Sequence, residues 1–404
     1  MQKTTVLRLR IPVWKFADYC ALYIVLWAVI PVLSRGDIYR FVAVAASIVS
    51  LLSILPRKIG RVGNYAFLSL LLILLLILNI GFFAGDYGSA ISRAMNMFVF
   101  CMIGLISTYY YECDKKKFSK MALFVLAVYI LTAIPSIIAL QSNRWVLRNA
   151  SGRSVRTGVE VFAGAYGYVF GCLFLVIILI YDLRNNARNK AGKIFEIALI
   201  ALFGYIVINA GYTTALVLLV IGVFVALFFP KKNAIIASFV MIIAAFALMQ
   251  IIPVALRWII SNFQISDVYR AKIHYLAQLT DSSSEVTYAD STRGGMFYES
   301  LAALVRYPVL GSITLSGQEA ATGHAVLLDT LVNHGVLYFA LYLYVIVMTP
   351  WRLMKSDKTM QMIYLVMIVL LGLTDTIDYA TMAIPLFIGP MIVDNALNRE
   401  REES

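Results

Sequence analysis

The stretch YAFLSLLLILLLILNIGFF, from Tyr65 to Phe83, is an apolar run without a single charged side chain. An α-helix rises about 1.5 Å per residue, so roughly 20 apolar residues cross a hydrocarbon core of about 30 Å. Lipid offers no hydrogen-bond partners to backbone groups, and a run that crosses it must therefore be helical. This stretch predicts a transmembrane helix and, with it, an all-α fold.

The chain as a whole has the composition of a membrane protein. Of its 404 residues, 61% are hydrophobic and only 14% are charged, and the mean hydropathy is +0.83. Soluble domains are about half apolar and about a quarter charged. We therefore predict a polytopic integral membrane protein. The basic N-terminus is followed by an apolar run without a small-residue cleavage site, which predicts an uncleaved first helix and not a signal peptide.

Hydropathy and helix breakers predict about twelve spans. They lie near residues 16–34, 38–56, 64–83, 90–111, 119–140, 161–181, 194–209, 212–229, 233–253, 325–349, 360–374 and 380–394. The chain then divides into residues 1–253 with nine spans, a large loop at 254–324, and residues 325–404 with three spans and a tail. In the large loop, two stretches with apolar residues at helical spacing flank a polar linker, which predicts a cap of short amphipathic helices.

Lysine and arginine are unevenly distributed among the predicted loops. If the N-terminus is cytoplasmic, the inner loops collect most of the 34 basic residues and nearly all of the lysines. Short loops rich in lysine and arginine stay on the cytoplasmic side of a membrane. We therefore predict an even number of spans, with both termini in the cytoplasm and the large loop outside.

One short outer loop, residues 141–160, departs from this rule. Its segment NRWVLRNASGRSVRTG holds four arginines. Arginine presents a planar fork of donors that matches phosphate oxygens; the alternative roles are contact with lipid headgroups or pairing with acidic residues. We favour an anion site, to which Arg40 and Arg93 can add because they lie toward the outer ends of their predicted helices. The loop arginines are Arg144, Arg148, Arg153 and Arg156, of which Arg144 is the one most suited to headgroup contact alone.

Several function classes find no support in the sequence. The net charge of +12 lies mostly in short loops between spans, which argues against a face that binds nucleic acid. The four cysteines lie in or beside predicted spans without a CxxC pair, so neither a disulfide framework nor a metal site is predicted. Walker, GxSxG and HExxH patterns do not occur. His274, His324 and His334 stand as candidate general bases.

Residues 291–338 carry a more specific pattern. The segment STRGGMFYESLAALVRYPVLGS, followed by ATGHAVLLDTLVNHGVLY, resembles the C-terminal signature of bacterial O-antigen polymerases and O-antigen ligases. In that signature an arginine precedes an aromatic-bearing helix that ends in a Pro-x-x-Gly turn. A histidine then opens a span with leucines and a glycine at fixed offsets. The matching residues here are Arg293, the turn from Pro308 to Gly311, His324, Leu328, Leu331 and Gly335.

The resemblance extends to two further segments and has three departures. Residues 156–171 are similar to the family's passage from a basic outer loop into a span, and residues 209–222 to a span that opens with an arginine in many members. That arginine is missing here near Thr213, Ala325 replaces the asparagine that usually follows the histidine, and Tyr338 replaces a second glycine. The arginine-rich loop could supply the missing diphosphate contact.

The resemblance implies a GT-C-like membrane glycosyltransferase of lipopolysaccharide biosynthesis in the bacterial inner membrane. Its donor would be an undecaprenyl-diphosphate-linked glycan, used at the periplasmic face without a metal or cofactor, and a chain-length regulator protein could be a partner. His324 would accept the proton of the attacking sugar hydroxyl, with Glu299 and Glu319 in reserve. The diphosphate and its developing charge would be bound by Arg40, Arg93, Arg148, Arg153, Arg156 and Arg293.

Three functions stay open at this point. A polymerase would move the growing glycan from its lipid carrier onto the next lipid-linked repeat unit, and a ligase would move the finished chain onto lipid A-core. The missing span arginine and Ala325 favour the polymerase, because polymerases vary with the sugars they join. A lipid-linked glycan flippase would show charged or broken helices near the membrane midplane and often repeated halves, which this sequence lacks.

Overall fold

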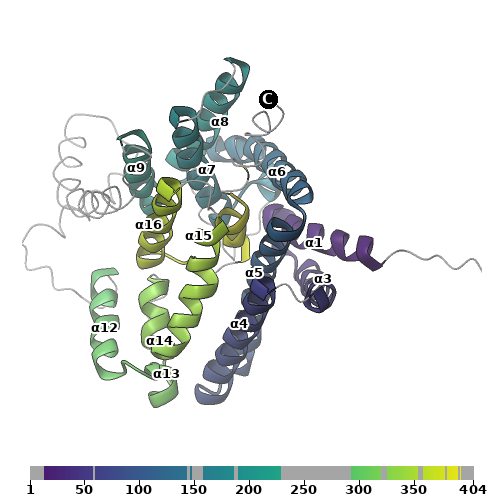
Figure 1. Ribbon diagram of the computed structural model, residues 1–404. Helices are drawn as coiled ribbons and strands as arrows, with labels where there is room; N and C mark the ends of the chain where they lie inside the picture. Colours follow the sequence, from purple (N-terminus) through teal and green to yellow (C-terminus); the bar gives the residue numbers. More distant parts are fainter. Residues whose placement is uncertain are drawn as a thin grey trace, which may run out of the picture.

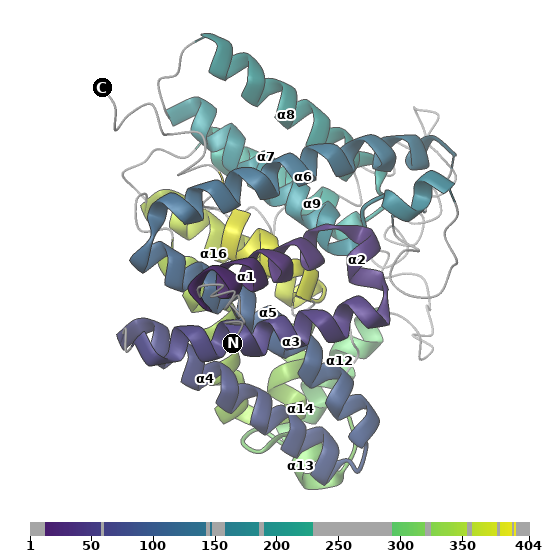
Figure 2. The same cartoon turned by 90° about the vertical axis from the view of Figure 1, so that its right-hand side faces the viewer.

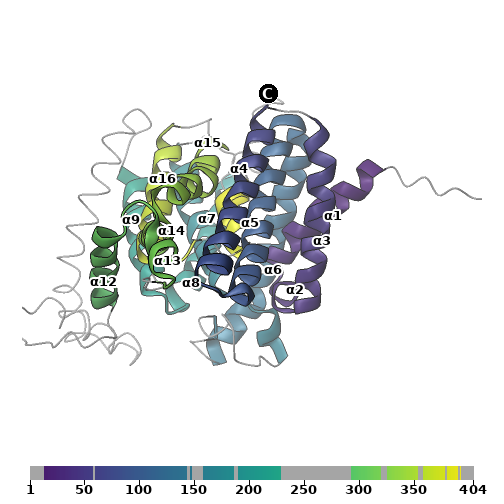
Figure 3. The same ribbon diagram turned by 90° about the horizontal axis from the view of Figure 1, so that it is seen from below.

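The computed structural model describes residues 13–57, 60–142, 146–147, 158–185, 190–228, 293–319, 325–353, 358–377, 380–389 and 392. These residues form helices and no strand, so the all-α prediction is confirmed for this part of the chain. The long helices stand side by side, as seen best from below in Figure 3. The predicted span at 233–253 lies outside the described residues.

Six helical segments are long and apolar enough to cross a membrane. They are Gly60–Phe83, Tyr87–Cys113, Lys115–Ser142, Tyr166–Asn185, Lys190–Asn209 and Val326–Leu353. Four shorter apolar helices accompany them, at Phe16–Val29, Ile38–Ile54, Thr214–Phe228 and Lys358–Thr374. These segments coincide with predicted spans, and they are compatible with a protein embedded in a membrane.

The N-terminal half forms α1 to α6. Its elements are α1 (Val13–Val29), α2 (Pro31–Arg35), α3 (Asp37–Ile54), η1 (Leu55–Arg57), α4 (Gly60–Ile77), η2 (Leu78–Phe83), α5 (Tyr87–Cys113) and α6 (Lys115–Ser142). The predicted span 16–34 is interrupted at Ile30, which is extended with φ −83° and ψ 114°. Pro31 causes this break, because proline disfavours helical backbone in the residue before it and suits the first helical position.

The described residues from 158 onward form the remaining elements. These are η4 (Gly158–Phe162), α7 (Tyr166–Asn185), α8 (Lys190–Asn209), α9 (Thr213–Phe228), α12 (Arg293–Arg306), α13 (Gly311–Ser316), α14 (Val326–Tyr342), η5 (Leu343–Met348), α15 (Thr349–Leu353), α16 (Lys358–Thr374), η6 (Ala380–Met382) and η7 (Ile384–Ile388). Of these, α8, α9, η6 and η7 pack on α7. Figure 2 shows α7 and α8 on one side of α6, and α1 and α3 on the other. Helix α7 is the most buried of the six long spans and forms the centre of the bundle.

The segment 380–389 differs from the continuous span predicted at 380–394. It consists of the 3₁₀ turn η6 and the π-helical turn η7, and η7 is wholly buried. Phe387 contacts Tyr65 and Phe100 edge to face, with ring centroids 6.3 and 5.5 Å apart. The Tyr364 hydroxyl donates hydrogen bonds to the carbonyl oxygens of Pro385 and Leu386. Irregular backbone is tolerated at this depth because protein groups, and not lipid, surround it and satisfy its polar atoms.

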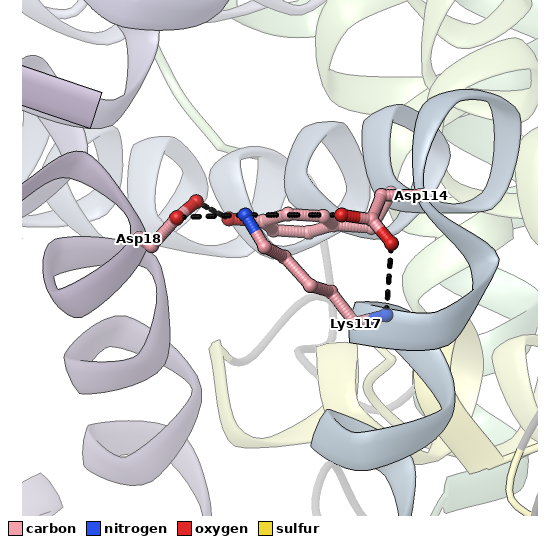
Figure 4. Close-up of polar contacts among 4 residues, drawn as sticks. Asp18, Asp114 and Lys117 are labelled. Atoms are coloured by element: carbon pink, nitrogen blue, oxygen red, sulfur yellow. Dashed lines mark hydrogen bonds and ion pairs between the residues drawn. The ribbon is translucent and has the colours of Figure 1, made fainter. Parts of the chain in front are cut away.

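One end of the bundle gathers lysines, where α5 ends and α6 and α16 begin. We call it the lysine-rich end; its described lysines are Lys115, Lys116, Lys117, Lys120, Lys190, Lys193 and Lys358. Lys117 lies between two carboxylates there, with its Nζ 2.8 Å from Asp18 Oδ2 and 3.8 Å from Asp114 Oδ2 (Figure 4). The Tyr110 hydroxyl donates to Asp18 Oδ1 at 2.5 Å. These contacts fasten α1 to the turn between α5 and α6.

Candidate functional site

The described part of the large loop lies at the other end of the bundle. Helix α12 packs on α14, and α13 packs on both α14 and η2 (Figure 1). The second stretch with apolar residues at helical spacing is helical at 293–306, as predicted, and a further short helix at 311–316 was not predicted. We call this region the α13 end. The first stretch, at 259–279, lies outside the described residues.

A backbone break divides α14 at Gly335. This residue has φ 79° and ψ 175°, a region that is essentially restricted to glycine. The Val336 N–H next to it donates to the carbonyl oxygen of Val309 at 3.0 Å. A Cβ at Gly335 would lie 2.1 Å from that same oxygen. The glycine therefore allows α14 to touch, backbone to backbone, the turn that begins at Pro308.

The turn from Pro308 to Gly311 also contacts α14 from its own side. Gly311 has φ 79°, and a Cβ there would lie 2.4 Å from the carbonyl oxygen of Asn333. The Ser312 hydroxyl donates to Asn333 Oδ1 at 3.1 Å, and the Thr314 hydroxyl donates to Asn79 Oδ1 at 2.7 Å. The two separated halves of the sequence signature, Pro308–Gly311 and Asn333–Gly335, are thus in direct contact, and η2 holds their position.

Arg93 and Glu319 form a bidentate ion pair at this end. Arg93 Nη1 lies 2.7 Å from Glu319 Oε1, and Nη2 donates to Oε2 at 3.2 Å. Arg40 reaches the preceding residue of α5, because its Nη2 donates to the Ser92 carbonyl oxygen at 2.8 Å and to its hydroxyl at 3.2 Å. Arg40 therefore binds the residue next to Arg93, so two of the predicted anion-binding arginines meet at this part of α5. Arg93 already pairs with Glu319, the reserve base. An incoming phosphate would have to replace the Glu319 carboxylate or share the Arg93 guanidinium with it.

His334 lies directly before the backbone break at Gly335. Its ring packs against Tyr338, with centroids 4.5 Å apart and planes tilted by 38°. Arg93 is close enough for its charge to act on the imidazole, and among the described residues the buried Nδ1 has no hydrogen-bond partner. Sequence reasoning left His334 as one histidine among three; the available signal was its position directly before the signature glycine.

The Asp329 side chain binds the N-terminal end of α14. This helix begins shortly after His324. Asp329 Oδ2 accepts a hydrogen bond from the Ala325 backbone N–H at 3.3 Å, and Oδ1 accepts one from the Ser300 hydroxyl at 3.4 Å. The buried carboxylate is also placed in the first helical turn, where negative charge is favoured. Sequence reasoning missed Asp329, although an acidic residue at the predicted start of a helix was the signal that could have found it.

The structure describes only some of the predicted site residues. His324, Arg148, Arg153 and Arg156 lie outside the described residues, as does Arg144. Arg293 begins α12 and Glu299 lies within it, but the positions of these two side chains are not described. Within the described residues no group of three or more metal-ligating side chains occurs.

Asp86 caps the helix that carries Arg93. Its carboxylate accepts a hydrogen bond from the Ser89 backbone N–H at 2.9 Å. Hydrogen bonds from the Ser89 side chain and backbone, together with the charge of Arg93, lower the pKa of Asp86 below its ordinary value of 3.8. A lowered pKa stabilises the folded protein above the ordinary pKa, and that contribution disappears as the pH falls through the folded-state pKa. We therefore expect Asp86→Ala to lower the melting temperature at neutral pH.

The same experiment carries its own pH control. The difference in melting temperature between Asp86→Ala and the wild type should shrink as the pH falls from 3.8 through the lower folded-state pKa of Asp86, because the wild type then loses its charged cap. Asp86→Asn retains a capping oxygen without a titrating proton, so it should keep stability at neutral pH and lose the pH dependence. Equal melting temperatures of wild type and Asp86→Ala at neutral pH would contradict the capping role.

Comparison with known families found no family model that matches the chain. A comparison with curated proteins likewise found no match. The functional argument therefore rests on the residues and contacts described above.

Proposed function

We propose that this protein is an O-antigen polymerase. It transfers a glycan from undecaprenyl diphosphate onto the next lipid-linked repeat unit, at the periplasmic face of the bacterial inner membrane. The observation that supports this most directly is the contact between the Pro308–Gly311 turn and the Asn333–Gly335 break. These two motifs resemble parts of one family signature, and one lies in a loop while the other lies in a span. They meet at the end of the bundle that also holds Arg40 and Arg93.

The chemistry divides between a base and a set of cations. The acceptor hydroxyl oxygen attacks the anomeric carbon of the donor, its proton passes to His324, and the bond from that carbon to the diphosphate oxygen breaks. The diphosphate leaves with the electron pair, and guanidinium groups stabilise the charge as it develops. Since diphosphate is a stable leaving group, the reaction as proposed uses neither a metal nor a cofactor.

The described contacts assign supporting roles. Asp329 fixes the backbone N–H of Ala325, and the Val326 N–H donates to the Asp375 carbonyl oxygen at 3.4 Å. These bonds hold Ala325 and Val326, the two residues after His324, and this supports Asp329 as a positioning residue in the proposed mechanism. Arg93 binds the diphosphate when Glu319 gives way to it, and the arginines of loop 141–160 bind the rest.

The proposal includes an arrangement in the membrane. The lysine-rich end faces the cytoplasm, as the positive-inside rule requires, and the α13 end faces the periplasm. The chain has about twelve spans by hydropathy, with both termini in the cytoplasm, and the loop 254–324 completes a GT-C-like cap. A chain-length regulator protein is a partner consistent with this reaction.

The surface polysaccharide of a strain that lacks this protein tests the proposal. A polymerase defect leaves lipid A-core that carries a single repeat unit, because ligation still occurs. A ligase defect leaves core without any repeat unit while lipid-linked polymer accumulates, and this outcome would replace the proposed function by the ligase. An unchanged ladder of chain lengths would contradict both.

A further inference from the structure

A cavity of about 300 Å³ opens at the lysine-rich end, opposite the α13 end. It lies between the start of α4, the end of α5 and the segment from η5 to α15. Its charged and aromatic lining consists of Arg61, Tyr65, Tyr111, Glu112, Tyr344 and Arg352. None of these residues takes part in the proposed glycan transfer.

The Arg352 guanidinium is held in a defined place within this lining. Its Nη1 donates to the Tyr344 hydroxyl at 2.9 Å, and its central carbon lies 4.9 Å from the centre of the same ring. The π-helical turn η5 places Tyr344 for both contacts. A cation that is oriented before a ligand arrives loses less conformational entropy on binding.

Arg61 adds a second cation to the same cavity. Its Nη1 lies 3.1 Å from Glu112 Oε1, a single contact that orients the side chain and leaves 68% of it exposed. With Arg352 and Glu112, the described lining carries a net positive charge. Thr108 and Thr349 also line the cavity, but their hydroxyls donate to the carbonyl oxygens of Gly104 at 2.8 Å and Tyr344 at 2.9 Å. The two guanidinium groups are therefore the donors that suit phosphate oxygens.

The position of the cavity indicates what kind of phosphate it meets. The cavity extends from Arg61 and Glu112, near the ends of their helices, to Tyr65 and Thr108, about one helical turn further in. In a membrane this distance matches the thickness of the headgroup layer. Basic pockets between spans on the lysine-rich side are typical sites for anionic headgroups. Phosphatidylcholine fits poorly, because its choline cation would face the guanidinium groups.

We propose that this cavity binds the phosphate headgroup of an anionic phospholipid. The guanidinium groups of Arg61 and Arg352 contact the phosphate oxygens, and Tyr344 keeps Arg352 in the binding orientation. The inference depends on the membrane setting of the chain and not on which reaction it performs.

The test measures lipid binding to the full-length protein by native mass spectrometry after removal of bound lipid. We expect phosphatidylglycerol to bind the wild type more tightly than phosphatidylcholine. Arg352→Gln should weaken phosphatidylglycerol binding about tenfold, the usual cost of one charge-assisted hydrogen bond. Arg352→Lys keeps the charge but loses the planar fork of guanidinium donors, so its affinity for phosphatidylglycerol should lie between those of the wild type and Arg352→Gln.

Two controls make the result specific. Lys193→Gln removes one positive charge from α8 at the same end, away from the cavity, and should leave binding unchanged. Circular dichroism verifies that every variant retains its helices. Equal phosphatidylglycerol binding by wild type and the Arg61→Gln, Arg352→Gln double variant would overturn the proposal. Displacement of phosphatidylglycerol by an excess of inorganic phosphate would overturn its assignment to a lipid.

Discussion

Replacement of His324 by alanine is expected to reduce glycan transfer by about 10²–10⁴-fold, the contribution of a positioned general base. In the proposed mechanism the arginines bind the donor diphosphate and the imidazole does not, so the variant should still bind the lipid-linked donor. Polymer formation is measured in liposomes that contain the purified protein and lipid-linked repeat units. Donor binding is measured separately on the same preparation. Loss of transfer with binding retained identifies a group that acts on the reacting atoms.

The result also discriminates between the rival functions and bases. Unchanged polymer formation in His324→Ala would remove His324 from the mechanism. Glu319→Gln would then be tested next, although both oxygens of Glu319 already accept hydrogen bonds from Arg93. Transport of the lipid-linked glycan across the same liposomes, without formation of a glycosidic bond, would overturn the enzyme and favour a flippase.

The features that the sequence predicted well are those set by local composition. An apolar run in lipid has only one way to satisfy its backbone, so the helices at 60–83, 87–113 and 166–185 follow from hydropathy alone. The cap at Asp86 and the break at Pro31 are also local, but neither was predicted: residues 16–34 were predicted as one continuous span. The segment 380–389 is helical, but its 3₁₀ and π turns were not predicted, because hydropathy reports burial in an apolar setting and not the backbone geometry within it.

The candidate site depended on contacts that no local pattern contains. Arg93 and Glu319 are 226 residues apart, so their pairing follows from how α13 packs on η2. The contact between Gly335 and the carbonyl oxygen of Val309 likewise joins a span to an earlier turn, which local helical spacing does not reveal. The arginines of loop 141–160 lie outside the described residues, and their contact with diphosphate stays a prediction.

Replacement of Gly335 by alanine should destabilise the protein by about 3 kcal/mol or more. Two independent penalties act at this residue. Its φ of 79° with ψ of 175° is strained for any side chain, and the new Cβ would lie 2.1 Å from the Val309 carbonyl oxygen. The neighbouring atoms are backbone and cannot rotate away, so the turn at Val309 must separate from α14. We expect a marked fall in melting temperature, measured by thermal unfolding in detergent.

Gly204 provides the matched control on α8. It also lies within an apolar helix, but a Cβ there meets nothing within 4 Å and its φ is not positive. Gly204→Ala should therefore leave stability unchanged or raise it by up to about 1 kcal/mol, since alanine has the higher helix propensity. If Gly335→Ala unfolds at the temperature of Gly204→Ala, the contact between the turn and α14 is not structural. If only Gly335→Ala is destabilised, the glycine is required because two backbones must touch, which places the two halves of the signature in one folded unit.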